Sequence, residues 1–149
     1  MGIWFVKPEK EKAADIISNT MVAHLGIAFT EVGDDYIKAS MPVDHRTHQP
    51  MGILHGGASV ALAETLASFA ANCCIDMAKY YCVGLEINAN HIRSVRTGNV
   101  IGCAKPVHMG RTTQIWEVRI HDEENDLICI SRVTMAVLAH KQAAGQNEP

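Results

Sequence analysis

The stretch from Gln49 to Ile75 constrains the fold more than any other part of the chain. It opens with Pro and Gly residues, which interrupt regular secondary structure, and these continue as far as His55-Gly56-Gly57. A run of small and apolar residues then reaches Ile75 without another Gly or Pro. Ala, Leu and Val over this length predict a long helix that is buried on most of its sides.

A single charged residue, Glu64, lies between Gly57 and Asp76 in this predicted helix. A buried carboxylate costs free energy unless it is paired, hydrogen-bonded or used in function. The helical repeat places Glu64 on one face with Ala61 and Ser68, which we expect to look toward a cleft or a partner subunit. The alternative is a carboxylate that only makes hydrogen bonds across a subunit interface.

Composition limits the possible classes of protein. The chain has 149 residues and a formal net charge of −3, with scattered Lys and Arg, which predicts one domain and no nucleic-acid partner. Its five cysteines lack paired spacing, so we expect reduced, buried thiols in a cytoplasmic protein. The chain start lacks a signal-peptide pattern, and polar residues interrupt the long apolar run, so no membrane segment is expected.

The remaining elements follow from turn signals and alternation. An N-terminal helical segment within residues 1–25 is expected, and a polar, frayed tail over 140–149. Strands are predicted over 27–32, 36–43, 82–88, 99–107, 113–121 and 127–138, and a polar segment over 89–97. Two strands, one buried helix and four more strands predict an α+β domain over 1–149, with a curved antiparallel sheet wrapped around one long central helix. Edge-to-edge dimerisation would cover the edges of such a sheet.

The start of the helix is suited to carbonyl chemistry. The first N–H groups of a helix lack internal acceptors, and glycine lets a substrate carbonyl approach the backbone. The amide of Gly56, with Gln49 or His55 nearby, could stabilise an oxyanion during acyl transfer. The alternative is a glycine-rich turn with His55 as its cap. Glu64 lies about 13 Å beyond His55 along a helix, so both reach one carbonyl only across a dimer interface.

The pattern Gln49-Pro50-x-Gly52-x-x-His55-Gly56-Gly57, with Glu64 and Ser68, resembles the motif of hotdog-fold acyl-CoA thioesterases. The similar branch is the PaaI-like one, which includes the bacterial 1,4-dihydroxy-2-naphthoyl-CoA and enterobactin-pathway proofreading thioesterases. The resemblance extends through residues 41–47, 83–93 and 131–134. It therefore covers nearly the whole chain.

The resemblance implies roles for five residues. Glu64 would be the general base or the nucleophile, and the Gly56 N–H of the other subunit would polarise the thioester carbonyl. Gln49 and His55 would help to hold the thioester, and Ser68 would position water near Glu64. The resemblance also implies a homodimer with two shared active sites, and often a homotetramer built as a dimer of dimers.

The implied substrate is an acyl-CoA with an aromatic acyl group, such as 1,4-dihydroxy-2-naphthoyl-CoA or a benzoyl-type CoA. Coenzyme A carries phosphates, so basic residues should bind it, although charges in solvated loops are the alternative for each candidate. The candidates for the nucleotide are His91, Arg93, Ser94, Gly110, Arg111 and Thr112, and those for the acyl pocket are Met51, Val60 and Phe69. No metal or redox cofactor is expected for such a hydrolysis. His45 and His48 lie close together in the sequence but lack a carboxylate or cysteine partner at metal spacing.

Two other functions are compatible with the same fold. One is a non-catalytic acyl-CoA-binding sensor, but no DNA-binding segment accompanies the domain. The other is a hotdog hydratase or dehydratase, which pairs a His with an acid at adjacent carbons. The set of Gln49, His55-Gly56 and Glu64 fits attack on a carbonyl better.

Overall fold

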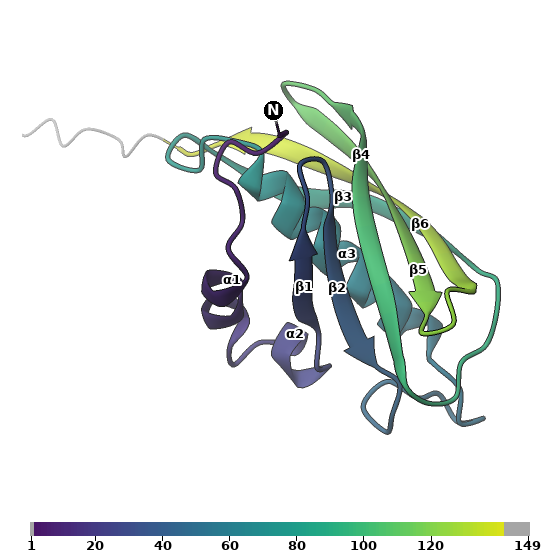
Figure 1. Ribbon diagram of the computed structural model, residues 1–149. Coiled ribbons are helices and arrows are strands. Elements are labelled where there is room, and N and C mark those ends of the chain that lie inside the picture. The colour runs from purple at the N-terminus through teal and green to yellow at the C-terminus, as the bar shows by residue number, and fades with distance from the viewer. Residues whose placement is uncertain (1, 142–149) are drawn as a thin grey trace, which may run out of the picture.

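The computed structural model describes residues 2–141. A six-stranded antiparallel sheet, in the order β1-β2-β4-β5-β6-β3, curves around the long helix α3 (Figure 1). The expected α+β architecture with a central helix is therefore confirmed. The elements are α1 (Lys10–Ile17), α2 (Met21–His24), β1 (Ala28–Val32), β2 (Ile37–Pro42), α3 (Gly56–Cys73), β3 (Tyr80–His91), β4 (Asn99–Met109), β5 (Thr113–Asp122) and β6 (Leu127–Ala139).

Helix α3 forms because its start is capped and its interior lacks breakers. The His55 Nδ1 accepts a hydrogen bond of 2.7 Å from the amide of Gly57, which satisfies one of the unpaired donors of the first turn. Leu62 and Leu66 are fully buried against the sheet. At Gly102 of β4 a Cβ would lie only 2.6 Å from the Cδ1 of Leu66, so this glycine lets the sheet approach the helix closely.

The inner face of the sheet supplies the rest of the core. Along β5 the residues Gln114, Trp116, Val118 and Ile120 alternate with less buried ones and are all at most 2% exposed. The indole of Trp116 donates a hydrogen bond of 3.0 Å to the Oε1 of Gln114, so the buried amide has a partner. The alternating residues of the predicted strand over 113–121 therefore form a buried inner face, with Trp116 in the core.

The predicted end of the strand over 82–88 is wrong. Strand β3 runs to His91, whereas a polar segment was expected from residue 89, because pairing with β6 continues from Tyr80↔Ala139 to His91↔Cys129. Backbone pairing therefore keeps the chain extended over residues whose side-chain pattern does not predict a strand.

The N-terminal segment contains the separate helices α1 and α2, and Asn19 between them has a left-handed φ of 58° that ends the first helix.

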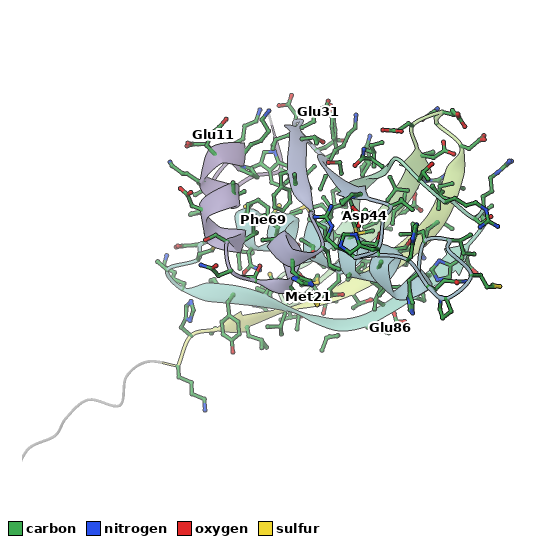
Figure 2. The ribbon with its side chains drawn as sticks, turned by 90° about the horizontal axis from the view of Figure 1, so that it is seen from below. Glu11, Met21, Glu31, Asp44, Phe69 and Glu86 are labelled. Atoms are coloured by element: carbon green, nitrogen blue, oxygen red, sulfur yellow. The ribbon has the colours of Figure 1, made fainter. Side chains whose placement is uncertain are left out.

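The two edges of the sheet differ. Strand β1 lies beside α1, whereas β3 has a neighbouring strand on one side only (Figure 1). Figure 2 shows β3, marked by Glu86, running along the margin of the molecule. Leu85 on this strand is 65% exposed and Val83 is 41% exposed. A long edge strand with exposed apolar side chains is a surface that natural proteins usually pair or cover.

None of the helices in residues 2–141 combines the length and the apolar character needed to cross a bilayer. The expected frayed tail lies, from residue 142 onward, outside the described residues.

Candidate active site

A cavity of about 340 Å³ lies at the N-terminus of α3. The loop before the helix, the first helical turn and the segment that follows β3 form its walls. The residues that line it are Gln49, Ile53, Leu54, Gly56, Ser59, His91, Ile92, Arg93, Ser94 and Ile128. Five of the expected site residues therefore meet in one cavity, and they come from parts of the chain up to 45 residues apart (94 − 49).

Gly56 presents an unpaired backbone donor at the wall of this cavity. Its amide has no hydrogen-bond acceptor among residues 2–141. The helix dipole adds partial positive charge at this point. A Cβ at position 56 would lie 2.8 Å from the Nε2 of His91, so only glycine leaves the imidazole room to lie against the backbone. The first turn of α3 can thus receive a partial negative charge from a ligand.

The loop that carries Gln49 is held by its backbone. The amide of Gln49 donates to the carbonyl of Ile53 at 2.8 Å, and the amide of Gly52 donates to the carbonyl of Gln49 at 2.9 Å. Gly52 has a φ of 71°, a conformation that favours glycine. A hydrogen bond of 2.8 Å between the His48 Nε2 and the carbonyl of Arg96 ties the loop to the segment that follows β3. Gln49 is therefore fixed at the cavity.

Glu64 lies elsewhere on the same helix. Its carboxylate is half-buried beside the edge strand β3, and the hydroxyl of Ser68 donates to its Oε1 at 3.3 Å. Glu64 does not line the cavity at Gly56, which lies about 12 Å away along the helix axis, because eight residues separate the two. Within one protomer, the carboxylate and the Gly56 amide do not face the same space.

His55 and the three candidates for the acyl pocket lie outside the cavity at Gly56. His55 caps α3 and lines a second cavity of about 250 Å³ on the other side of the helix start. Met51 is 72% exposed, and Val60 is half-buried on α3. Phe69, labelled in Figure 2, packs against Phe29 of β1 with a ring-centroid distance of 4.5 Å. A single protomer does not bring Met51, Val60 and Phe69 together.

The two candidate sites for the nucleotide are far apart in one protomer. Gly110, Arg111 and Thr112 form the turn between β4 and β5, where the amide of Gly110 donates to the carbonyl of Thr113 at 2.8 Å. This turn lies near the first residues of β3, whereas His91 ends that strand. The separation along the sheet is roughly 27 Å at the usual rise of a strand.

Positive charge is available at the cavity. The Arg93 Nη1 lies 3.9 Å from the Oδ2 of Asp126, and both side chains are more than half exposed. An exposed pair at this distance is weak, so the guanidinium remains free to bind an anion.

Among the described residues, one group has the spacing to hold a metal ion, and it consists of Asp122, Glu124 and Asp126 in the β5–β6 turn. None of these three lines the cavity.

Sequence reasoning missed several neighbours of the site. Ser59 and Ile128 line the cavity, but nothing in their local patterns indicates that they meet. Gly84 in β3 lies against the carboxylate of Glu64. A glycine between apolar residues of a strand was the available signal, because it often marks a close approach of another group.

Comparisons with known proteins identify the family of this chain. The family model described as the thioesterase superfamily matches residues 51–129. The 1,4-dihydroxy-2-naphthoyl-CoA hydrolase of Escherichia coli is 48% identical over 136 residues, which cover 91% of this chain and 99% of that protein. The proofreading thioesterase EntH of Cronobacter sakazakii is 52% identical over 120 residues, which cover 80% of this chain and 86% of that protein.

Solved structures give the same result. The crystal structure of a mutant thioesterase from Pseudomonas aeruginosa has a TM-score of 0.92 at 47% identity and covers 93% of this chain and 100% of that one. A thioesterase structure from Haemophilus influenzae has a TM-score of 0.91 at 46% identity and covers 96% of this chain and 99% of that one. The chain belongs to the thioesterase superfamily and is a thioester hydrolase with the hotdog fold.

Proposed function

We propose that the protein hydrolyses an acyl-CoA thioester, with a preference for an aromatic acyl group, at a site shared by two protomers. The observation that carries this proposal is the separation of two groups within one chain. The Gly56 amide is unpaired at the wall of a cavity, and Glu64, the only carboxylate of α3, does not line that cavity. Membership of a thioesterase family favours hydrolysis over the sensor and hydratase alternatives.

In the proposed reaction the thioester carbonyl oxygen accepts a hydrogen bond from the Gly56 amide. Negative charge grows on this oxygen as the carbonyl carbon becomes tetrahedral, and the helix dipole stabilises it. Gln49 helps to hold the thioester from the loop side. His55 contributes indirectly, because it lies outside this cavity and its Nδ1 caps the helix start by accepting a hydrogen bond from the amide of Gly57.

Glu64 of the other protomer supplies the attack. It either takes a proton from a water molecule that adds to the carbonyl carbon, or attacks that carbon itself to form an anhydride that water then cleaves. In both routes the C–S bond breaks, CoA leaves as its thiol and the acid is released. The hydroxyl of Ser68, which donates to the Glu64 Oε1 at 3.3 Å, orients the carboxylate and the water.

Strand β3 is the proposed surface of dimerisation. Its outer backbone edge has no partner strand among residues 2–141, and antiparallel pairing with a second copy would satisfy this edge and give the exposed Val83 and Leu85 cross-strand neighbours. Such pairing reverses one chain relative to the other, so the start of one β3 lies beside the end of its partner. In the proposed register Gly84 lies opposite His91 of the partner subunit, which brings Glu64 to the partner's cavity.

The reversal also joins the two candidate sites for the nucleotide. Arg111 lies near the start of β3 and Arg93 just after its end, so one residue from each protomer can reach the phosphates of a single CoA. The aromatic preference rests on similarity to the Escherichia coli 1,4-dihydroxy-2-naphthoyl-CoA hydrolase. We further propose that Met51, Val60 and Phe69 shape the acyl pocket in the assembled protein, which is a dimer or a dimer of dimers.

The proposal is tested by the variant Glu64→Gln and a panel of acyl-CoAs. Free CoA thiol is followed for benzoyl-type, 1,4-dihydroxy-2-naphthoyl, long-chain and β-hydroxyacyl substrates. We expect kcat to fall by about a thousandfold or more, with little change in KM, because the carboxylate acts in the transition state. Glu11→Gln is the matched control, since Glu11 is an exposed carboxylate on α1, outside the proposed dimer strand. Full turnover by a folded Glu64→Gln protein refutes the assignment.

A further inference from the structure

The geometry points to Gly84 as a positioning residue for the proposed reaction: the missing side chain in β3 creates the slot that holds the Glu64 carboxylate. This inference rests on the proposed function, because it assigns a purpose to the position of Glu64. It concerns a residue that makes no contact with the scissile bond.

Gly84 faces helix α3. Alternation along the strand places it on the same side as Cys82, which is 7% exposed and belongs to the core. A Cβ built at Gly84 would overlap with the Oε1 of Glu64 and would lie 3.1 Å from its Cδ. The φ of Gly84 is not in the left-handed region, so its backbone conformation does not demand glycine. The requirement is space for the carboxylate.

The slot is held rigidly on both sides. Asn72, two turns after Glu64 on α3, accepts a hydrogen bond of 2.8 Å from the amide of Cys82 and donates one of 3.2 Å to its carbonyl. These two bonds fix the distance between the helix and the strand two residues before Gly84. Just after Gly84 the β3–β6 register shifts, which is the sign of a bulge.

The slot selects one orientation of Glu64. With its Oε1 against Gly84 and within 3.3 Å of the Ser68 hydroxyl, the carboxylate is held from two directions. A methyl group at position 84 would push this oxygen away from both. The obstructed atom is the end of a flexible side chain, so the chain would relieve the overlap by rotating Glu64 while the fold stays intact. A displacement of about 1 Å at a catalytic group is enough to lower turnover about a hundredfold.

The test is Gly84→Ala, with Gly102→Ala as its matched control. Gly102 also lies in a strand and faces α3, but a Cβ there meets Leu66 and Leu62 instead of Glu64. We expect Gly84→Ala to lower kcat about a hundredfold with KM nearly unchanged and with a cooperative thermal transition. Gly102→Ala should lower the melting temperature and leave the kcat of the folded protein within about threefold.

Rescue by a shorter acid separates positioning from a general structural effect. Glu64→Asp withdraws the carboxylate by one methylene and makes room for the new methyl group. The double variant Gly84→Ala/Glu64→Asp should therefore turn over faster than Gly84→Ala alone, whereas Glu64→Asp should not improve Gly102→Ala. If Gly84→Ala fails to fold, Gly84→Ala/Glu64→Ala should fold, because the overlapping group is gone.

Three outcomes overturn the inference. They are a Gly84→Ala enzyme with undiminished kcat, a loss of kcat that Glu64→Asp does not reverse, and a double variant with Glu64→Ala that remains unfolded. The proposed function survives each of them if Glu64→Gln is inactive. An active Glu64→Gln enzyme removes the proposed function and this inference together, so the two failures are distinguishable.

Discussion

Mixed dimers test the proposed shared site directly. Two inactive variants are combined, Glu64→Gln in one protomer and Gly56→Ala in the other. The added methyl in Gly56→Ala would lie 2.8 Å from the Nε2 of His91, so it displaces the imidazole and fills the wall of the cavity. We expect each homodimer to lose activity about a hundredfold or more. Both altered groups lie at the margin of the core, so both variants should fold.

The expected activity of the mixed dimer follows from the geometry. The two groups lie about 12 Å apart along one helix. In the proposed dimer, a complete site therefore takes Glu64 from one protomer and Gly56 from its partner. A two-fold dimer of the two variants then has one intact site and one doubly altered site. Its kcat per dimer should be about half that of the unaltered dimer.

The assay uses two affinity tags to isolate the mixed dimer after co-expression, and measures CoA release with a benzoyl-type substrate. A matched pair, Glu64→Gln with Ser68→Ala, alters two groups that belong to the same half-site, 3.3 Å apart. This pair should retain only half the activity of Ser68→Ala. Activity of the Glu64→Gln/Gly56→Ala dimer no higher than that of its parents would refute the reasoning, because it would place both groups in one protomer's site.

Three further predictions concern assembly and stability. Leu85→Asp should weaken the dimer at least about a hundredfold in sedimentation experiments and reduce turnover with it, because it replaces an exposed leucine of β3 in both copies; Leu85→Met should not. Leu62→Ala should lower the free energy of unfolding in urea by about 2–5 kcal/mol, since Leu62 is fully buried; a loss below about 1 kcal/mol would contradict its place in the core. Burial raises the pKa of the Cys73 and Cys82 thiols to about 11 and of the Cys74 thiol to about 12. As the pH rises, these thiols therefore ionise in the unfolded chain before they ionise in the folded protein. Their contribution to stability should be complete below about pH 9 and decline above it, measured against a variant with alanine at all three positions.

Local patterns were sufficient for the central helix and part of the sheet. The His55 cap, the absence of breakers and the apolar run together specify α3, because these effects act between residues close in the chain. Alternation identified the buried face of β5 for the same reason. The sequence also shows that Glu64 is the only charged residue of this helix, and the helical repeat alone predicts which face carries it.

Other features depend on contacts between distant segments. The extension of β3 to His91 comes from pairing with β6, some 40 residues later in the chain. The same pairing brings His91 and Arg93 to the cavity at Gly56. Two hydrogen bonds between the Asn72 side chain and the backbone of Cys82, one donated and one accepted, set the gap in which Gly84 receives the Glu64 carboxylate. A sequence read one stretch at a time therefore specifies α3 and its lone acid. Only the folded sheet decides what that acid touches, because strand pairing and bulges join residues whose local patterns contain no information about one another.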